Sequence, residues 1–316
     1  MYRLNDEQQR IVQQARAVAD ASIAPHAARV DRERAFPIES LAALGGAGLL
    51  GLTVPTEYGG MGQGLRTMAA VLDEVAQRCA STAMVYLMHM AGVGCYAAAA
   101  EKTRPLLEAA SRGTHLSTLA FSEKGSRSHF WAPVSRAERH NGGVRLTAQK
   151  SFVTSAGHAH GYVVSTLATD ATQPLESTIY LVLRDDAGIM VSGAWEGLGM
   201  RGNASAPMTL DKVAVGEARA LSAPGKGLDM MLGVVLPTFQ IGTAAVALGL
   251  AEAAVQATAR HLTTARLDHM NSALADLPTL RARLAQMCGT TSIRRPSGAG
   301  STRCSRCGTT TPRTAR

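Results

Sequence analysis

The sequence predicts an α+β protein with an N-terminal helical domain, a central antiparallel β domain and a C-terminal helical bundle that is incomplete. Three observations predict this class. Apolar residues follow a helical spacing to about residue 112, short β-rich runs between turn residues replace it near residue 116, and the helical spacing returns after Pro224. The expected domains are residues 1–115 (all-α), 116–222 (β-barrel-like), 223–288 (a partial α domain) and 289–316 (a tail).

The N-terminal helices are predicted from caps and apolar spacing. Asn5 followed by Gln8 has the pattern of a capping box, so a helix starts there, and Pro25 closes or kinks it. Further helices are expected over residues 38–44, 65–78 and 81–96. The stretch from Thr82 to Ala100 is uncharged and long enough to cross a bilayer, but it contains a histidine and two glycines. We therefore expect a buried helix and no membrane contact.

The central β domain is predicted from alternation. Val144, Leu146 and Ala148 alternate with polar neighbours, as in a strand with one buried face. Further short strands are expected at residues 162–166, 179–183 and 208–210. Two helices are expected after this domain, over residues 241–261 and 280–288.

Composition excludes several classes of protein. With 46% hydrophobic and 18% charged residues in 316, the chain suits a soluble protein of two or three domains. Residues 289–316 hold six Arg and no acidic residue, so most of the net charge of +8 lies there and no nucleic-acid partner is expected. The five cysteines show no disulfide pattern and the N-terminus lacks a secretory signal, so we expect a cytoplasmic protein.

The tail at residues 289–316 differs from the rest of the chain. It has one Ile as its only large aliphatic residue, and it has no aromatic residue, so it buries too little apolar surface to offset its ordering entropy. We expect a disordered or out-of-frame segment, with a genuine basic tail as the alternative. Cys304 and Cys307 lack the second ligand pair that a metal site needs.

The usual motifs of phosphate-binding and triad enzymes do not occur. The sequence has no GxGxxG after a strand, no P-loop and no specific Ser-His-Asp order. His158 and His160 stand two apart, but a metal site would need a third ligand. We therefore expect two surface histidines in a turn and no metal.

Several segments, taken in order, carry a resemblance to a known family. They are Ile23-Ala24-Pro25 and the run from Leu49 to Gly60, then Ala120–Ser128 (AFSEKGSRS), Gln149–Ala156 (QKSFVTSA) and Leu198–Ser205 (LGMRGNAS). In this order they resemble the acyl-CoA dehydrogenase family over roughly residues 1–288. The resemblance implies an FAD-dependent oxidoreductase of fatty acid metabolism, usually a homotetramer, that takes electrons from an acyl-CoA and passes them to an electron-transfer acceptor.

The resemblance also assigns flavin-side residues. Phe121 and Ser122 match the stretch that contacts the pyrimidine edge of FAD, where negative charge builds on reduction and a donor is needed. Phe152 stands where the family commonly has Trp beside the isoalloxazine, and Thr154 matches the Thr near flavin N5. These two residues stand two apart on a strand, so we expect them to face the same side. Arg266 matches an arginine that holds the flavin pyrophosphate.

The substrate side departs from the family. Ser128 matches a serine that touches the thioester, but it stands in Arg127-Ser128-His129 where the family has Gly-Ser-Asp. The family's substrate arginine maps near Phe239-Gln240 and is replaced, and its usual catalytic Glu lies beyond the recognisable sequence, so no catalytic residue is assigned. We expect weak FAD binding and slow or no turnover. The alternatives are a flavin-dependent monooxygenase of the same fold and an inactive truncated product.

Overall fold

The computed structural model describes residues 2–126 and 129–294. Its contacts divide the chain into two compact units. One is Leu4–Gly249, and the other contains Leu250–Arg316 with Met1–Arg3. The first unit holds the N-terminal helices, the β domain and the start of the last long helix, and each unit is described by itself.

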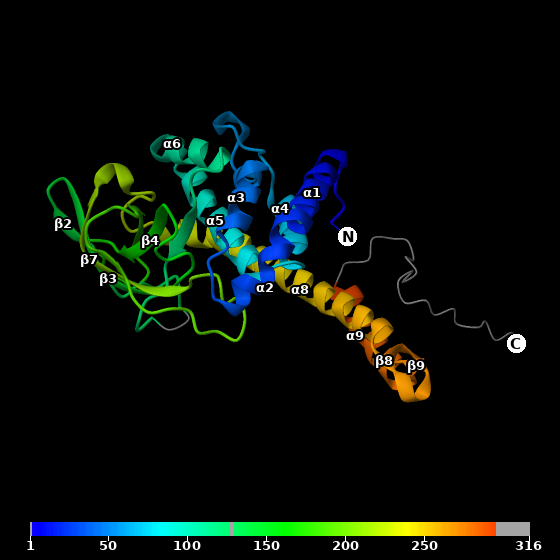
Figure 1. The fold of residues 1–316 in the computed structure, drawn as a ribbon. Coiled ribbons are helices and arrows are strands. Elements are labelled where there is room, and N and C mark those ends of the chain that lie inside the picture. Colours follow the sequence, from blue (N-terminus) through cyan, green and yellow to red (C-terminus); the bar gives the residue numbers. More distant parts are fainter. Residues whose placement is uncertain (1, 127–128, 295–316) are drawn as a thin grey trace, which may run out of the picture. The chain divides into compact units, whose positions relative to one another are not determined.

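The four helices predicted in the N-terminal part begin close to their expected positions (Figure 1). Asn5 forms the predicted capping box, because its side chain accepts a hydrogen bond from the backbone N–H of Gln8 over 2.9 Å. Pro25 lies in the first turn of α2, after a π-helical turn at Ala19–Ile23 that separates α2 from α1. The helices are α1 Asp6–Val18, α2 Ala24–Arg32, α3 Ile38–Gly46, α4 Leu65–Ala76, α5 Ala80–Ala98 and α6 Ala100–Ser111, with 3₁₀ turns at Leu49–Gly51 and Thr56–Tyr58.

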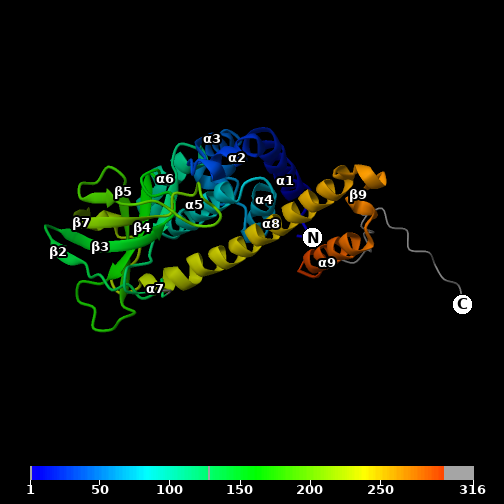
Figure 2. The ribbon, with the colours of Figure 1, turned by 60° about the horizontal axis from the view of Figure 1, so that its bottom comes forward.

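Helix α5 is the buried helix that the sequence predicts. It packs against α4 and α6 on the helical side and against strand β1 (Ser117–Ala120) on the other. Gly92 permits this close approach, because a Cβ there would lie 2.6 Å from the Ser117 Oγ. Figure 1 and Figure 2 both show α5 beside the sheet. Most of the uncharged stretch, from Thr82 to Tyr96, is thus core helix.

The β domain consists of two sheets. The first has the order β1-β4-β5, with β4 at Gly161–Leu167 and β5 at Ser177–Leu183. The second has the order β2-β3-β7-β6, with β2 at Glu138–His140, β3 at Gly143–Val153, β7 at Ala206–Gly216 and β6 at Ile189–Val191, and a 3₁₀ turn follows at Glu217–Arg219. The pairs are antiparallel as predicted, except that β1 and β4 run in parallel. The chain crosses through β2 and β3 before it returns beside β1, so β4 enters in the direction of β1.

The first sheet is covered on both faces, which explains its long apolar strands. One face contributes Leu119, Val163 and Leu181 to a core shared with Met88 and Tyr96 of α5. The other contributes Tyr162, Val164 and Val182 to a core shared with the second sheet, where Leu146 and Ala148 are buried as the alternation predicted. The result is three layers: helix, first sheet and second sheet.

The last helix begins earlier than the sequence predicted. Helix α7 (Gly227–Met230), a π-helical turn (Met231–Val235) and α8 (Leu236–Thr264) form one continuous helix instead of a helix limited to residues 241–261. By length and composition alone this helix of 38 residues could cross a membrane. A single such helix is weak evidence, because core helices of soluble proteins have the same composition.

The second unit contains a short hairpin and a helix. Strand β8 (Arg266–Leu267) pairs with β9 (Ser272–Ala273), 3₁₀ turns occupy Asp268–Met270 and Leu274–Asp276, and α9 covers Pro278–Arg294. Helix α9 extends six residues past Cys288, where the sequence predicted its end. The rest of the predicted tail, residues 295–316, lies outside the described residues.

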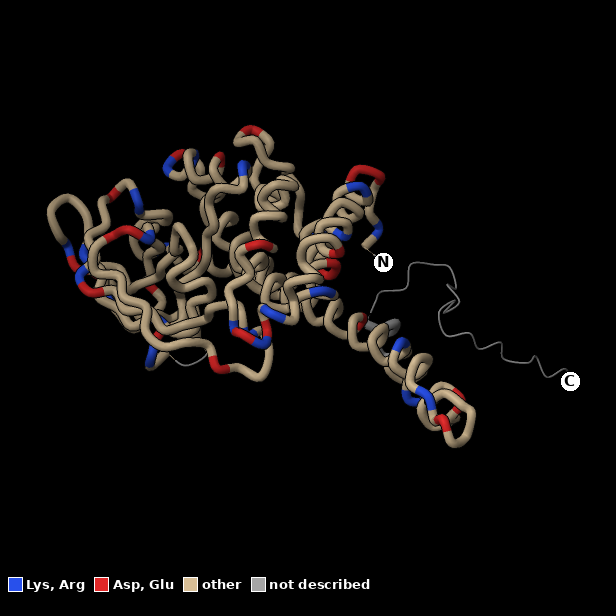
Figure 3. The backbone as a smooth tube through the Cα atoms, viewed as in Figure 1, with Lys and Arg blue, Asp and Glu red and all other residues tan. Residues whose placement is uncertain are grey.

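Charged residues are dispersed over the described chain. Figure 3 shows Lys and Arg interspersed with Asp and Glu, with long uncharged stretches between them. The described residues therefore show no basic stripe of the kind that nucleic-acid-binding proteins present.

Candidate functional site

A pocket of about 240 Å³ lies where α5, the first sheet, the end of β3 and the start of α8 meet. Its lining residues are Met88, Leu119, Phe121, Ser122, Phe130, Ser151, Phe152, Val235 and Phe239. The floor is formed by buried apolar side chains, among them Met88, Phe121 and Val235. Phe152 and Phe239 are exposed at the mouth, and none of these nine lining residues is charged.

Two predicted flavin-side segments meet at this pocket. Ser122 and Ser151 are 29 positions apart in the sequence, yet the Ser151 N–H donates a hydrogen bond to the Ser122 carbonyl oxygen over 2.8 Å. The contact places Phe121 and Ser122 beside Phe152 in one wall. The two serines supply the only polar side chains among the lining residues. This wall therefore offers hydroxyls, while the α5 and α8 side is apolar.

Phe152 has an unusual backbone. Its φ is +54°, the left-handed region that an aromatic residue rarely adopts, and 69% of its surface is exposed. The β3–β7 register shifts between Lys150 and Val153, so a bulge turns Phe152 out of the sheet. Such strain costs of the order of 1–3 kcal/mol and concentrates at functional sites.

Thr154 does not face the same side as Phe152, so that prediction is wrong. Thr154 is 5% exposed and does not line the pocket. The alternation rule fails because β3 ends at Val153 and the bulge precedes it. The Thr154 hydroxyl instead lies 2.9 Å from the Ser205 hydroxyl. The Thr154 carbonyl oxygen accepts a hydrogen bond from the Thr118 hydroxyl.

Backbone strain gathers where these segments meet. Ser155, Met200 and Ala204 also have positive φ values, of 61°, 54° and 50°. Ser155 N–H donates to the Asn203 carbonyl oxygen over 3.0 Å, which joins the turn after β3 to the loop before β7. The structure thus holds the surroundings of Phe152 by hydrogen bonds between two strained loops.

A buried ion pair behind the pocket was missed by the sequence reasoning. Lys150 Nζ lies 2.5 Å from Glu123 Oε1, and the two side chains are 0% and 2% exposed. Lys150 also donates to the Ser165 carbonyl oxygen, while Glu123 accepts from the backbone N–H groups of Val134 and Ser135. Each charged residue directly adjoins one of the serines of the pocket. The charged residues Glu123 and Lys150 in segments of the β domain could have indicated a buried ion pair. They are 27 positions apart in the sequence, however, and no local pattern predicts that residues so far apart meet.

The charges of this pair shift each other's pKa against the effect of burial. Burial alone raises the pKa of Glu123, but the Lys150 charge and the hydrogen bonds from Lys150 and Ser135 outweigh it and hold this pKa below its ordinary value. Burial lowers the pKa of Lys150, and the Glu123 carboxylate opposes this effect only in part. The geometry, with both ends hydrogen-bonded, is that of an ion pair.

The remaining predicted site residues lie elsewhere. Arg266 is exposed in strand β8 of the second unit. Ser128 and Arg127 lie outside the described residues. His158 lies in a turn as predicted, where its ring stacks on Phe36 at 3.9 Å, and no cluster able to hold a metal occurs in residues 2–126 and 129–294.

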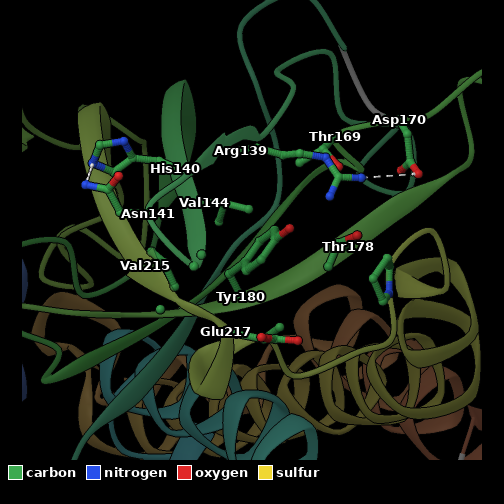
Figure 4. Close-up of a pocket in the computed structure, with 15 residues that line it drawn as sticks. Arg139, His140, Asn141, Val144, Thr169, Asp170, Thr178, Tyr180, Val215 and Glu217 are labelled. Carbon is green, nitrogen blue, oxygen red and sulfur yellow. Dashed lines mark hydrogen bonds and ion pairs between the residues drawn. The ribbon is translucent and has the colours of Figure 1, made fainter.

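A second and larger pocket, of about 550 Å³, lies on the β domain around the β2–β3 turn and β5. Figure 4 shows Tyr180 in its middle, with Arg139 and Asp170 above it. These two charges form a loose ion pair of 3.8 Å and are largely exposed, so solvent screens them. None of the predicted site residues that the structure describes lines this pocket, and the smaller, aromatic pocket remains the candidate site.

Comparisons with known proteins agree on one family. The sequence profile of the acyl-CoA dehydrogenase N-terminal domain matches residues 5–111, and that of the middle domain matches residues 118–213. Together the two profiles match more than half of the chain.

Individual relatives cover most of the chain. It is 29% identical to the probable acyl-CoA dehydrogenase YngJ of Bacillus subtilis over 81% of its own length and 68% of that protein. It is 26% identical to a cyclohex-1-ene-1-carbonyl-CoA dehydrogenase of Syntrophus aciditrophicus over 91% and 69%. The butyryl-CoA dehydrogenase structure from Megasphaera elsdenii matches with a TM-score of 0.85 at 20% identity, over 92% of this chain and 77% of that one. The chain thus spans about two thirds of the length of these relatives.

Proposed function

Because the chain belongs to the acyl-CoA dehydrogenase family, a family of flavin-dependent oxidoreductases, we propose that the aromatic pocket holds the isoalloxazine ring of FAD. In this proposal the flavin edge lies against Ser122 and Ser151, and Phe152 packs on the ring. The acyl part of a thioester enters from the apolar side formed by Met88, Val235 and Phe239.

The exposed, strained Phe152 is the observation that supports this proposal most. An aromatic side chain with 69% of its surface in water is unfavourable, and its positive φ adds strain. A flat ring stacked on Phe152 would remove apolar surface from water and offset both costs. The neighbouring Ser122 hydroxyl can donate a hydrogen bond to the ring edge where negative charge develops. The residues present therefore fit a flavin.

The chain's own residues bind and orient, while FAD supplies the hydride acceptor for oxidation of a carbon–carbon bond. Phe152 covers the ring, the buried floor of Met88, Phe121 and Val235 excludes water, and the Glu123–Lys150 pair fixes the wall that carries the serines. No acid or base occurs among the nine lining residues, so none of them can remove the α-proton of a thioester. We expect slow turnover at most.

Weak FAD binding is expected for a related reason. The nine lining residues contain no cation for the flavin pyrophosphate, so the pocket contributes ring contacts and two hydroxyls.

We further propose that Arg266 contacts the flavin pyrophosphate in an oligomer. We also propose that the electrons pass to a separate acceptor protein, and that the protein is cytoplasmic and homotetrameric. The thioester contact of Ser128 belongs to the same proposal.

A flavin-dependent monooxygenase is the second candidate. It is favoured by Phe239, which stands in the pocket where an acyl-CoA dehydrogenase is expected to have a substrate arginine, and by the absence of a base among the lining residues. Such an enzyme uses oxygen and reduced flavin, and needs no base to take an α-proton.

Two measurements on the purified chain test these candidates. Visible flavin absorbance after gel filtration measures FAD retention, and dye-linked oxidation of acyl-CoAs measures dehydrogenation. The proposal predicts FAD binding with slow or no dye reduction. Stoichiometric FAD with rapid dye reduction would contradict the expected lack of a base, and oxygen consumption with supplied reduced flavin would favour the monooxygenase.

A further inference from the structure

The phenylalanines and tryptophans of this chain are concentrated at one pocket. The sequence contains five phenylalanines and two tryptophans. Four of the five phenylalanines line the 240 Å³ pocket, namely Phe121, Phe130, Phe152 and Phe239. Each tryptophan packs edge-on against one of them, Trp131 on Phe130 at 5.1 Å and Trp195 on Phe152 at 6.2 Å.

A hydrophobic core alone does not explain this concentration. The core beside α5 contains Phe121, with Phe130 packed against it, whereas the core between the sheets contains no phenylalanine and consists mostly of Ala, Val and Leu. Phe152 and Phe239 are 69% and 38% exposed, so they contribute to the mouth of a pocket more than to a core. Aromatic faces present a specific geometry to other rings, which aliphatic side chains do not.

The proposed flavin accounts for only one wall. Ser122, Ser151 and Phe152 form the β-domain side, whereas Phe239 projects from α8 and Phe130 from the loop after the first sheet's β1 strand. The side formed by Met88, Val235 and Phe239 carries no hydrogen-bonding side chain and no charge. A polar or charged group there would lose its hydration without compensation.

We propose that the apolar side of this pocket selects an uncharged ring, so that the substrate is a thioester whose acyl group carries one aromatic or cyclic six-membered ring. This inference rests on the proposed function, because it assigns the flavin to the opposite wall. On the side opposite the proposed flavin, Phe130 and Phe239 can pack edge-on or offset against such a ring.

The expected selectivity follows from these contacts. Each aromatic pair contributes about 0.5–1.5 kcal/mol beyond its area, so two pairs favour an aromatic ring over a linear chain of equal carbon number by about tenfold in Kd. Met88 adds an adaptable thioether that also interacts favourably with ring edges. The linear chain loses additional rotational freedom on binding.

The test is isothermal titration calorimetry of the FAD-saturated protein with benzoyl-CoA, cyclohexanecarbonyl-CoA and heptanoyl-CoA, whose acyl groups all have seven carbons. The CoA part is common to the three probes, so differences in Kd report the acyl group. We expect benzoyl-CoA to bind about tenfold more tightly than heptanoyl-CoA, and cyclohexanecarbonyl-CoA, which makes no aromatic pair, to show a smaller preference. Phe239→Leu keeps an apolar side chain at an exposed position but removes one of the two aromatic pairs, so it should reduce the benzoyl preference to about threefold. Phe36→Leu, at the one phenylalanine outside the pocket, should leave the preference unchanged.

Three results would overturn the inference: heptanoyl-CoA binding as tightly as benzoyl-CoA, a benzoyl preference that Phe239→Leu leaves unchanged, or displacement of FAD by benzoyl-CoA. Failure of the proposed function looks different, since FAD would then not saturate the protein. In that case benzamide and heptanamide are compared in the FAD-free protein by tryptophan fluorescence, because both tryptophans contact pocket phenylalanines. A ring preference there supports the selectivity without the flavin, and equal binding of the two amides contradicts it.

Discussion

Replacing Lys150 with Met removes one partner of the buried Glu123–Lys150 pair and tests whether this pair holds the pocket wall. The substitution keeps the length and most of the volume of the side chain but leaves the Glu123 carboxylate buried without its cation. It also removes the donor to the Ser165 carbonyl oxygen. Breaking a buried pair on one side costs about 3–5 kcal/mol, a large fraction of the roughly 5–15 kcal/mol by which a protein is stable.

The assay is urea unfolding followed by circular dichroism, with thermal unfolding as a second readout. A loss of about 3–5 kcal/mol corresponds to a fall in Tm of about 6–20 °C for a unit of this size. Lys124→Met is the matched control, because Lys124 is exposed on the same segment and its removal should change the free energy of unfolding by less than about 0.5 kcal/mol. Adding Glu123→Gln to Lys150→Met should restore part of the loss, since the amide oxygen still accepts from Val134 and Ser135 and no charge is stranded.

The pH dependence gives an independent sign test. In the native protein the Glu123 pKa is lowered, so its contribution is present at neutral pH and is lost as pH falls through that lowered pKa. In Lys150→Met, burial without the cation raises the Glu123 pKa, so the cost is largest at neutral pH and shrinks as the carboxyl is protonated. The reasoning is refuted if Lys150→Met is within about 1 kcal/mol of the native protein, or if the double variant is less stable than the single one.

Three further predictions concern groups away from this pair. Burial lowers the pKa of His115 to about 3 and that of His89 to about 4, whereas a histidine in the unfolded chain has a pKa of about 6.5. Below about pH 6.5 the unfolded chain therefore binds protons that the folded chain does not. The free energy of unfolding should decrease as the pH is lowered, by up to about 1.4 kcal/mol per pH unit for each histidine. Urea unfolding between pH 7 and pH 5 measures this slope, and an unchanged slope in His115→Gln would show the assignment to be wrong. Gly161→Ala should lower the free energy of unfolding by about 1–3 kcal/mol, because the added Cβ would lie 2.4 Å from the Tyr96 hydroxyl oxygen. Thermal unfolding measures this loss against the control Gly199→Ala, where nothing lies within 4 Å of the added Cβ, and equal stability of the two variants would contradict the prediction. Arg266→Ala, at an exposed position, should change the free energy of unfolding by less than about 0.5 kcal/mol. It should nevertheless raise the Kd for FAD more than the Kd for riboflavin, which has no pyrophosphate, and equal effects on both Kd values would contradict the proposed pyrophosphate contact.

The order of helices and strands follows from local periodicity, and it could be predicted for that reason. The Asn5 cap, the buried α5 and the alternation of Leu146 and Ala148 are properties of short windows. The parallel pairing of β1 with β4 was not predictable in this way, because it depends on how distant strands meet.

The pocket shows the same contrast between features that could be predicted from the sequence and features that depend on long-range pairing. Phe121, Ser122 and Phe152 were singled out by resemblance, and the structure places them on one pocket, where their flavin contacts stay a prediction. The orientation of Thr154 was predicted wrongly, because a register shift in β3 breaks the two-residue alternation on which it was based. The parts of the site that depend on long-range pairing, above all Lys150 with Glu123, could be found only in the folded chain.

The most direct test of the central claim is a titration of the purified chain with FAD, followed by flavin fluorescence. The account predicts saturable binding of FAD. The Kd should be about tenfold higher in Ser122→Ala, because one hydrogen bond to the flavin edge is lost, and should rise further in Phe152→Ala. Phe36→Leu should leave the Kd unchanged. Equal Kd values for the native chain, Ser122→Ala and Phe152→Ala would place the flavin elsewhere, and no saturable binding at all would contradict the claim.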